Sequence, residues 1–226
     1  RRIVVNLAPA DIRKEGSAYD LPIAVGILAA TGQIKPRQLD RFLLMGELSL
    51  DGSLIPVRGA LSVAVQARKE GFSGILLPVA NAREAAVVEG IGVYGVATLA
   101  DVTGFLCGTT KLLPVENPGQ ELLTHGSEGD GTDFSDVKGQ ENAKRALEVA
   151  AAGGHNLLMT GSPGSGKTML ARRLPGILPK PTMEEAIEIT RIYSVAGMLP
   201  GNSGILTNRP FRNPHHTISA TALTGG

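Results

Sequence analysis

An α/β fold in two parts is predicted by three observations along this 226-residue chain. Before residue 110, short apolar runs alternate with helix-forming runs, which is typical of a sheet covered by helices. A Pro-, Gly- and acid-rich stretch with no apolar period follows over 111–133 and predicts a linker. Beyond it, over 134–226, a glycine-rich loop lies between an apolar run and a helix-forming run, as in the nucleotide-binding half of many α/β proteins.

The first part, 1–110, is predicted to fold in the order β-α-β-β-α-β-α-β-α, as a mixed sheet with helices packed on it. The dipeptide Asp51-Gly52 suits the tight turn of a hairpin between the second and third strands. Asn81 is expected to cap the third helix. The expected strands are 2–7, 42–50, 53–57, 74–77 and 92–96, and the expected helices are 21–31, 59–70, 81–89 and 98–106.

A phosphate-binding loop carries the chemistry of the second part. The apolar run 156–160 is predicted to be the strand that feeds this loop, and 169–174 to continue the helix that follows it. Glycines let the backbone turn its N–H groups toward phosphates, and the helix N-terminus adds the positive end of its dipole. The chain is therefore predicted to bind a nucleoside triphosphate. The loop residues are Gly161, Ser162, Pro163, Gly164, Ser165, Gly166, Lys167 and Thr168.

Two residues of the loop have predicted roles in binding. Lys167 is expected to reach the β and γ phosphates, and the Thr168 hydroxyl to ligate Mg²⁺. No apolar strand ending in Asp or Asp-Glu follows Thr168, although a motor ATPase needs one to hold Mg²⁺. Both ends of the chain read as cut. We therefore expect an internal part of a longer protein, which binds nucleotide but does not hydrolyse it alone.

Composition is that of an ordinary globular protein, with 42% hydrophobic and 19% charged residues. The single cysteine, Cys107, excludes an internal disulfide and, together with the nucleotide loop, indicates a cytoplasmic location. The longest apolar stretch, 21–30, is too short to cross a bilayer. The net charge is +1 overall, and the excess of basic residues over 134–226 is compatible with a nucleic-acid partner without demonstrating one.

Residues 8–108 resemble the proteolytic domain of Lon, a fold of the ribosomal protein S5 domain 2 type. The stretch 45–59 follows the hairpin of that family and the start of its next helix. Lon cleaves with a serine nucleophile and a lysine base, and these positions fall on Asp20 and Leu61. Because neither chemical group is present, the resemblance implies a protease fold without protease chemistry.

Residues 134–226 resemble the start of an AAA+ ATPase core. The resemblance rests on the run 134–140, the helix after it and the phosphate loop. An inactive Lon-like domain, an acidic linker and an AAA+ core are the arrangement of the magnesium-chelatase-related ATPases, the group that includes ComM and YifB. The stretches 14–24 and 209–216 match that group. The resemblance implies ATP and Mg²⁺ as cofactors and adenine contacts from the backbone of Asp136, Val137, Gly139 and Gln140.

The same resemblance implies the activity of the longer protein. It predicts a hexameric ring motor, an ATPase that acts on single-stranded or branched DNA as a helicase would, in recombination and natural transformation. Two other functions stay open: a magnesium-chelatase-type motor that drives metal insertion into a porphyrin, and a Lon-like peptidase or peptide-binding module. The Lon-like domain argues against the first, and Asp20 and Leu61 argue against cleavage.

A basic loop near the end of the chain is a candidate for contacts with DNA phosphates, although a Pro-flanked loop of this kind is more often structural. Adjacent histidines on an extended chain point to opposite faces, which argues against a shared metal. The candidate residues are Arg209, Arg212, His215 and His216.

Overall fold

The computed structural model describes residues 2–6, 17–117, 133–200, 204–215, 217–219 and 221. The chain forms two compact units. Unit 1 comprises Arg1–Leu123 and Met183–Leu206, and unit 2 comprises Thr124–Thr182 and Thr207–Gly226. The sequence predicts two domains, 1–110 and 134–226, joined by the linker 111–133. This division places 183–206 in the second domain. The domain boundaries stay a prediction for the whole protein.

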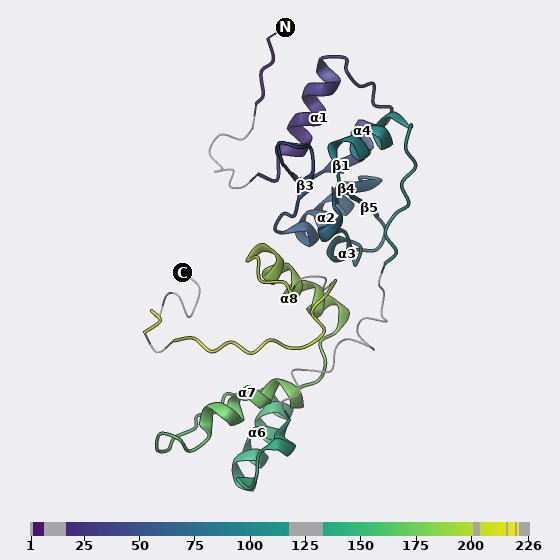
Figure 1. The fold of residues 1–226 in the computed structure, drawn as a ribbon. Coiled ribbons are helices and arrows are strands. Elements are labelled where there is room, and N and C mark those ends of the chain that lie inside the picture. Colours follow the sequence, from purple (N-terminus) through teal and green to yellow (C-terminus); the bar gives the residue numbers. More distant parts are fainter. Residues whose placement is uncertain are drawn as a thin grey trace. The chain divides into compact units, whose positions relative to one another are not determined.

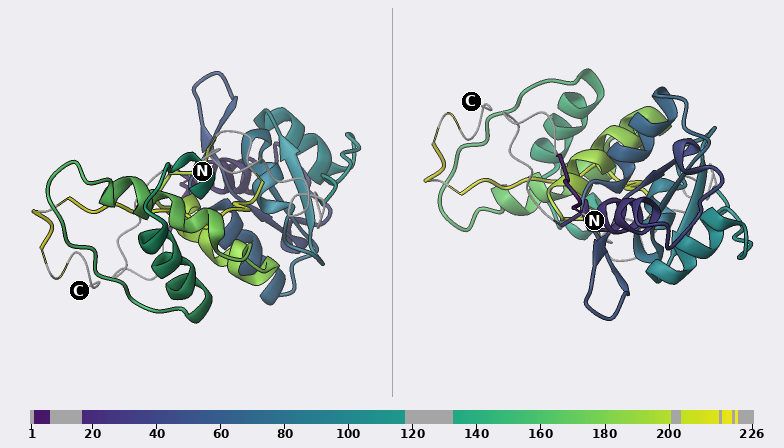
Figure 2. Two further views of the ribbon diagram at one scale, coloured as in Figure 1. Left: turned by 90° about the horizontal axis from the view of Figure 1, so that it is seen from below. Right: turned by 90° about the horizontal axis from the view of Figure 1, so that it is seen from above.

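A three-stranded parallel sheet forms the centre of unit 1. Its strands are β1 (Phe42–Leu44), β4 (Gly74–Pro78) and β5 (Gly92–Val96), in the order β1-β4-β5. A separate antiparallel hairpin pairs β2 (Glu47–Leu48) with β3 (Leu54–Ile55), and the turn falls at Asp51-Gly52 as predicted. Figure 2 shows the tip of this hairpin extending away from the rest of unit 1.

Helices cover both faces of the sheet (Figure 1). One face carries α1 (Asp20–Ala30) and α4 (Leu99–Cys107), and the other carries α2 (Ala60–Lys69) and α3 (Val79–Ala85); α8 (Met183–Val195) packs on α2. Side chains alternate along β4, so Leu76 packs with the α1 and α4 face while Ile75 and Leu77 pack with the α2 and α3 face. The predicted α/β class is confirmed, with two apolar layers around one sheet.

Two local predictions for unit 1 are wrong. The expected strand 42–50 divides into β1 and β2, because the chain leaves the sheet at Gly46, whose N–H donates to the Ala18 carbonyl at 3.0 Å. Asn81 does not cap α3 but lies inside it, where its amide group receives the Val57 N–H at 2.9 Å and donates to the Val57 carbonyl at 2.8 Å. Asn81 therefore fastens the end of the hairpin segment to α3.

The expected first strand, 2–7, is also not formed in residues 2–6; residue 7 lies outside the described residues. The side chain of Val4 is 78% exposed, so this apolar segment has no sheet to pack on. A β-strand needs hydrogen bonds from a neighbouring strand, and the described part of unit 1 provides none to these residues.

Unit 2 contains the turn η2 (Phe134–Asp136) and the helices α6 (Glu141–Gly153) and α7 (Lys167–Ile177). They enclose a small core made by Phe134, Val137, Leu147 and Leu170. The strand predicted at 156–160 is not formed, and Leu158 is 89% exposed. No strand partner for this run exists among the described residues of unit 2, so Leu157 and Leu158 stay exposed, while Met159 packs on the small core.

Candidate functional site

The phosphate loop predicted from the sequence lies at the N-terminus of α7. Gly164 and Gly166 have φ of 80° and 86°, a left-handed conformation that side-chain-bearing residues adopt at a cost. Gly166 is the N-cap of α7, so Lys167 and Thr168 form its first turn. The N–H groups of a first turn have no partner inside their own helix and point toward the loop. The loop therefore presents backbone donors and a helix dipole to an anion.

The Lys167 ammonium group lies within the loop. Its Nζ donates to the Gly161 carbonyl at 2.8 Å, to the Ser162 carbonyl at 2.8 Å and to the Ser165 hydroxyl at 3.2 Å. Backbone carbonyls are weak partners for a cation compared with a phosphate dianion. The positive charge is thus held at the centre of the loop by groups that a phosphate replaces readily.

Two glycines keep space that a side chain would fill. A Cβ at Gly161 would lie 3.1 Å from the Ser165 hydroxyl and 3.9 Å from Lys167 Nζ. A Cβ at Gly166 would lie 3.0 Å from the Gln140 amide nitrogen. The loop is therefore closely packed around the lysine, and a side chain at either glycine would displace its neighbours.

The segment predicted to contact adenine is joined to the phosphate loop. The side-chain amide of Gln140 donates to the Ser165 carbonyl at 3.2 Å, although 25 positions separate the two residues. Gln140 itself has φ of 60°, the one positive value among the described non-glycine residues. Val137 is buried in the small core of unit 2, while Gly139 has φ of 68°. The structure thus brings this segment beside the loop.

Arg173 on α7, whose role is not recognisable from the sequence, fixes the start of the same segment. Its Nη2 lies 3.2 Å from Asp136 Oδ2, and its Nε donates to the Asp133 carbonyl at 3.0 Å. Asp133 and Asp136 also form a capping box around η2. Arg173 follows Lys167 by less than two helical turns. No sequence motif indicates its role, because its partners lie about 40 positions earlier in the chain.

The surroundings of Asp133 at the start of η2 favour its ionised form. The backbone N–H of Ser135 lowers the pKa of Asp133 below its ordinary value of 3.8, and the Ser135 hydroxyl and the Arg173 charge act in the same direction. Asp133 therefore accepts hydrogen bonds as a carboxylate over the whole physiological pH range.

Thr168, the predicted magnesium ligand, is exposed at the second position of α7. Its place next to Lys167 agrees with the motif, in which a hydroxyl and an ammonium group share one triphosphate. Among the described residues no group of three His, Cys, Asp or Glu side chains is arranged to hold a metal ion by itself. A magnesium ion here would thus need the phosphates as ligands as well.

The two positions matched to the Lon dyad hold groups with structural roles. Asp20 is the first residue of α1, and its Oδ2 accepts the Leu48 N–H at 3.4 Å. Leu61 is fully buried in α2, and its N–H donates to Glu84 Oε1 at 2.9 Å. Glu84 also accepts the Ser194 hydroxyl from α8. A leucine in this apolar layer supports packing and accepts no proton.

The basic loop predicted for DNA lies partly outside the described residues, since His216 is not among them. Arg209 Nε donates to the Pro179 carbonyl at 2.8 Å, and His215 Nδ1 lies 2.8 Å from the Thr217 hydroxyl. Arg209 thus has a structural bond, and the predicted phosphate contacts of Arg209, Arg212 and His215 stay predictions. Within the described part of the chain, no helix has the length and apolar character to cross a membrane.

Comparison with known proteins agrees with these features. The family profile described as "Magnesium chelatase, subunit ChlI" matches residues 133–226, and the profile "Subunit ChlI of Mg-chelatase" matches residues 1–81. The competence protein ComM of Haemophilus influenzae is 45% identical over 226 residues, and the protein YifB of Escherichia coli is 44% identical over 231 residues. An uncharacterised protein of Mycobacterium tuberculosis is 44% identical over 225 residues.

All three matches cover 100% of this chain and 43–44% of the relative, so the chain spans less than half the length of these proteins. A shorter match supports the Lon likeness of unit 1: the archaeal Lon protease of Archaeoglobus fulgidus is 39% identical over 51 residues, which are 23% of this chain and 8% of that protein. With a phosphate loop at a helix N-terminus and a Lon-like α/β unit, the chain belongs to the magnesium-chelatase-related AAA+ family, in the group of ComM and YifB.

Proposed function

We propose that this chain binds ATP with Mg²⁺ at the loop 161–168. The observation that supports the proposal most strongly is the position of Lys167 Nζ, 2.8 Å from the loop carbonyls of Gly161 and Ser162, at the N-terminus of α7. A charge held there, beside unpaired first-turn N–H groups, suits the β and γ phosphates. A surface lysine on a glycine-rich turn would not need the close packing at Gly161.

Each residue has one task in this proposal. Lys167 leaves the loop carbonyls and binds the β and γ phosphates, and the backbone N–H groups of the loop orient them. Thr168 supplies a hydroxyl ligand to Mg²⁺, which neutralises phosphate charge when bound. The backbone of 136–140 lies along the adenine, held in place by the bonds of Gln140 to Ser165 and of Arg173 to Asp136.

For the whole protein we propose an ATPase, a ring motor that acts on DNA. Family membership supports an AAA+ motor, and rings, usually hexamers, are the common assembly of such motors. The name of the Haemophilus relative, competence protein ComM, supports DNA as the partner. Movement of single-stranded or branched DNA in recombination and natural transformation, within the cytoplasm, is the activity that we propose.

One experiment tests this function. The full-length protein is assayed for ATP hydrolysis alone, with single-stranded DNA and with forked DNA, and a Lys167→Ala variant serves as the control. Stimulation of wild-type turnover by DNA, with turnover lost in the variant, is the expected result. Hydrolysis that responds to a porphyrin and Mg²⁺ but not to DNA would favour the magnesium-chelatase-type motor instead.

Unit 1 supports a binding or scaffolding role. Leu61 replaces the base and Asp20 replaces the nucleophile of Lon, so peptide cleavage is not proposed. Incubation of the chain with an unfolded protein substrate and with a serine-directed phosphonate is expected to give no cleavage and no labelling. A labelled serine in unit 1 would show that the nucleophile lies elsewhere in this fold.

A further inference from the structure

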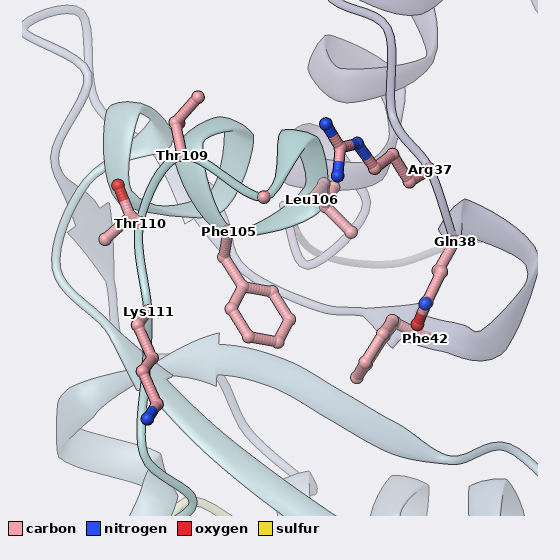
Figure 3. Close-up of a pocket in the computed structure, with 9 residues that line it drawn as sticks. Arg37, Gln38, Phe42, Phe105, Leu106, Thr109, Thr110 and Lys111 are labelled. Carbon is pink, nitrogen blue, oxygen red and sulfur yellow. The ribbon is translucent and has the colours of Figure 1, made fainter.

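A pocket of about 420 Å³ opens at the carboxyl end of α4 in unit 1. Its volume falls within the range of about 300–1,000 Å³ that is usual for small-ligand sites. The pocket lies between the end of α4, the loop before the turn η1 (Leu39–Arg41), and the start of β1 (Figure 3). Two aromatic rings, two cations and two hydroxyl groups line it: Phe42, Phe105, Arg37, Lys111, Thr109 and Thr110.

The aromatic rings are held by their neighbours. The ring centroids of Phe42 and Phe105 are 5.2 Å apart at an interplanar angle of 80°. Tyr94 on β5 contacts both, with centroids 5.8 Å from Phe42 and 4.9 Å from Phe105. The two contacts of Phe42 are edge-on and the Tyr94–Phe105 pair is tilted by 40°, and together they fix the ring orientations. Phe105 is only partly buried, and Figure 3 shows its ring at the centre of the pocket, so a rigid apolar surface is available to a planar ligand.

Among the residues that the structure describes, the cations of the pocket have no acidic partner. No acidic residue lines the pocket, and the side chains of Arg37 and Lys111 form no hydrogen bond or ion pair with any residue that the structure describes. In Figure 3 these two side chains lie on opposite sides of the Phe105 ring. The arrangement therefore offers two positive charges that flank one aromatic surface.

The wall at the end of α4 is already formed. The Thr109 hydroxyl and N–H both bind the Gly104 carbonyl, at 3.0 and 2.8 Å, and the Arg37 N–H donates to the Leu106 carbonyl at 3.0 Å. These bonds pair carbonyl groups at the C-terminus of α4 that have no partner inside the helix. A Cβ at Gly104 would meet the Thr110 side chain, so the turn packs directly on the helix. Little reordering is then needed on binding.

We propose that this pocket binds one nucleotide of a single-stranded nucleic acid. The base stacks on Phe105, and Arg37 and Lys111 bind the phosphates on either side of it. Aromatic stacking platforms combined with backbone-tracking cations are how proteins bind single strands without sequence preference. An acidic peptide would use the cations but gains nothing from a flat ring surface. The site is separate from the phosphate loop, and it rests on the proposed DNA partner only in the choice of probe.

The test measures binding of a fluorescent oligothymidylate to the whole chain by anisotropy, over a range of salt concentrations. The double variant R37Q/K111Q is expected to bind the strand at least about tenfold more weakly. The negative slope of log K against log salt is expected to become shallower by about 1.4, because each phosphate contact on a single strand contributes about 0.7 to its magnitude. Phe105→Leu is expected to weaken binding by about 5- to 150-fold at unchanged slope.

The matched control is K69Q/R83Q, which removes the same charge from two exposed cations of unit 1 that lie outside the pocket. It is expected to leave the affinity and the slope nearly unchanged. Equal loss in the two double variants would overturn the proposal, and so would displacement of the strand by oligoglutamate or by micromolar thymidine monophosphate. Should Phe105→Leu fail to fold, the salt slope of R37Q/K111Q decides alone. The assay contains no ATP, so its result does not depend on whether the phosphate loop binds ATP, and the two failures are distinguished.

Discussion

Arg173→Ala tests whether α7 positions the segment 136–140, which we propose to lie along the adenine. The Arg173 side chain is 16% exposed and that of Asp136 is 43% exposed, so the ion pair between them is only partly screened. The variant loses this pair and the bond from Nε to the Asp133 carbonyl. The segment that begins at η2 then keeps the Gln140 bond to Ser165 and the apolar contacts of Phe134 and Val137 with Leu170.

The size of the effect follows from these contacts. A partly exposed ion pair contributes about 0.5–1 kcal/mol, and a bond from a charged donor to a carbonyl contributes about 1.5 kcal/mol at such a site. Removal of Arg173 therefore destabilises the local arrangement by about 2 kcal/mol. If ATP binding must restore that arrangement, affinity falls by up to about 30-fold, since 1.4 kcal/mol corresponds to a factor of ten.

Isothermal titration of the chain with Mg-ATP measures this change. The control is Arg172→Ala, which removes the neighbouring exposed cation on the same helix and is expected to bind almost as well as wild type. Arg173→Lys is expected to fall between the two, because lysine keeps the charge but cannot bond to both partners in the fixed geometry of a guanidinium group. Equal affinity of the Arg172 and Arg173 alanine variants would refute the positioning role.

Three further outcomes are expected. Leu61→Ala lowers the free energy of unfolding of unit 1 by about 2–5 kcal/mol in urea titrations, because Leu61 is fully buried; a loss near zero would contradict the packing. The Asp133 carboxyl titrates below 3.8 in carbon NMR spectra, so its contribution to stability is complete above that pH and is lost as the pH falls through the lower folded-state value; a normal pKa would contradict the bonds to Ser135. In hydrogen exchange, the amides of β4 are protected far longer than those of 156–160, and equal protection would show a strand partner for that run.

Local patterns predicted much of unit 1. The strand 92–96 and the hairpin turn at Asp51-Gly52 are formed as expected, because strongly apolar runs and turn residues act over short distances. The break of the strand 42–50 was not predictable from the run itself. It depends on Gly46 meeting the carbonyl of Ala18, a contact that only the folded chain creates.

The same limit applies to the candidate site. The phosphate loop is recognisable because all of its parts are contiguous in sequence. Arg173 and the bond between Gln140 and Ser165 depend on residues 25 to 40 positions apart, and no residue pattern in a single sequence indicates such pairs. The position of α8 in unit 1 is also not predictable from local sequence. It depends on Ala186, a small residue that becomes fully buried in the α2 and α3 layer.

The central claim is that the loop 161–168 binds a triphosphate through Lys167. Binding of a fluorescent ATP analogue, with Mg²⁺, to the wild-type chain and to Lys167→Ala tests it most directly, with circular dichroism to confirm that both are folded. The account predicts saturable binding by the wild type and an affinity lower by at least about 100-fold in the variant, since the lysine contacts two phosphates at once. Equal binding by both folded chains, or none by either, would contradict it.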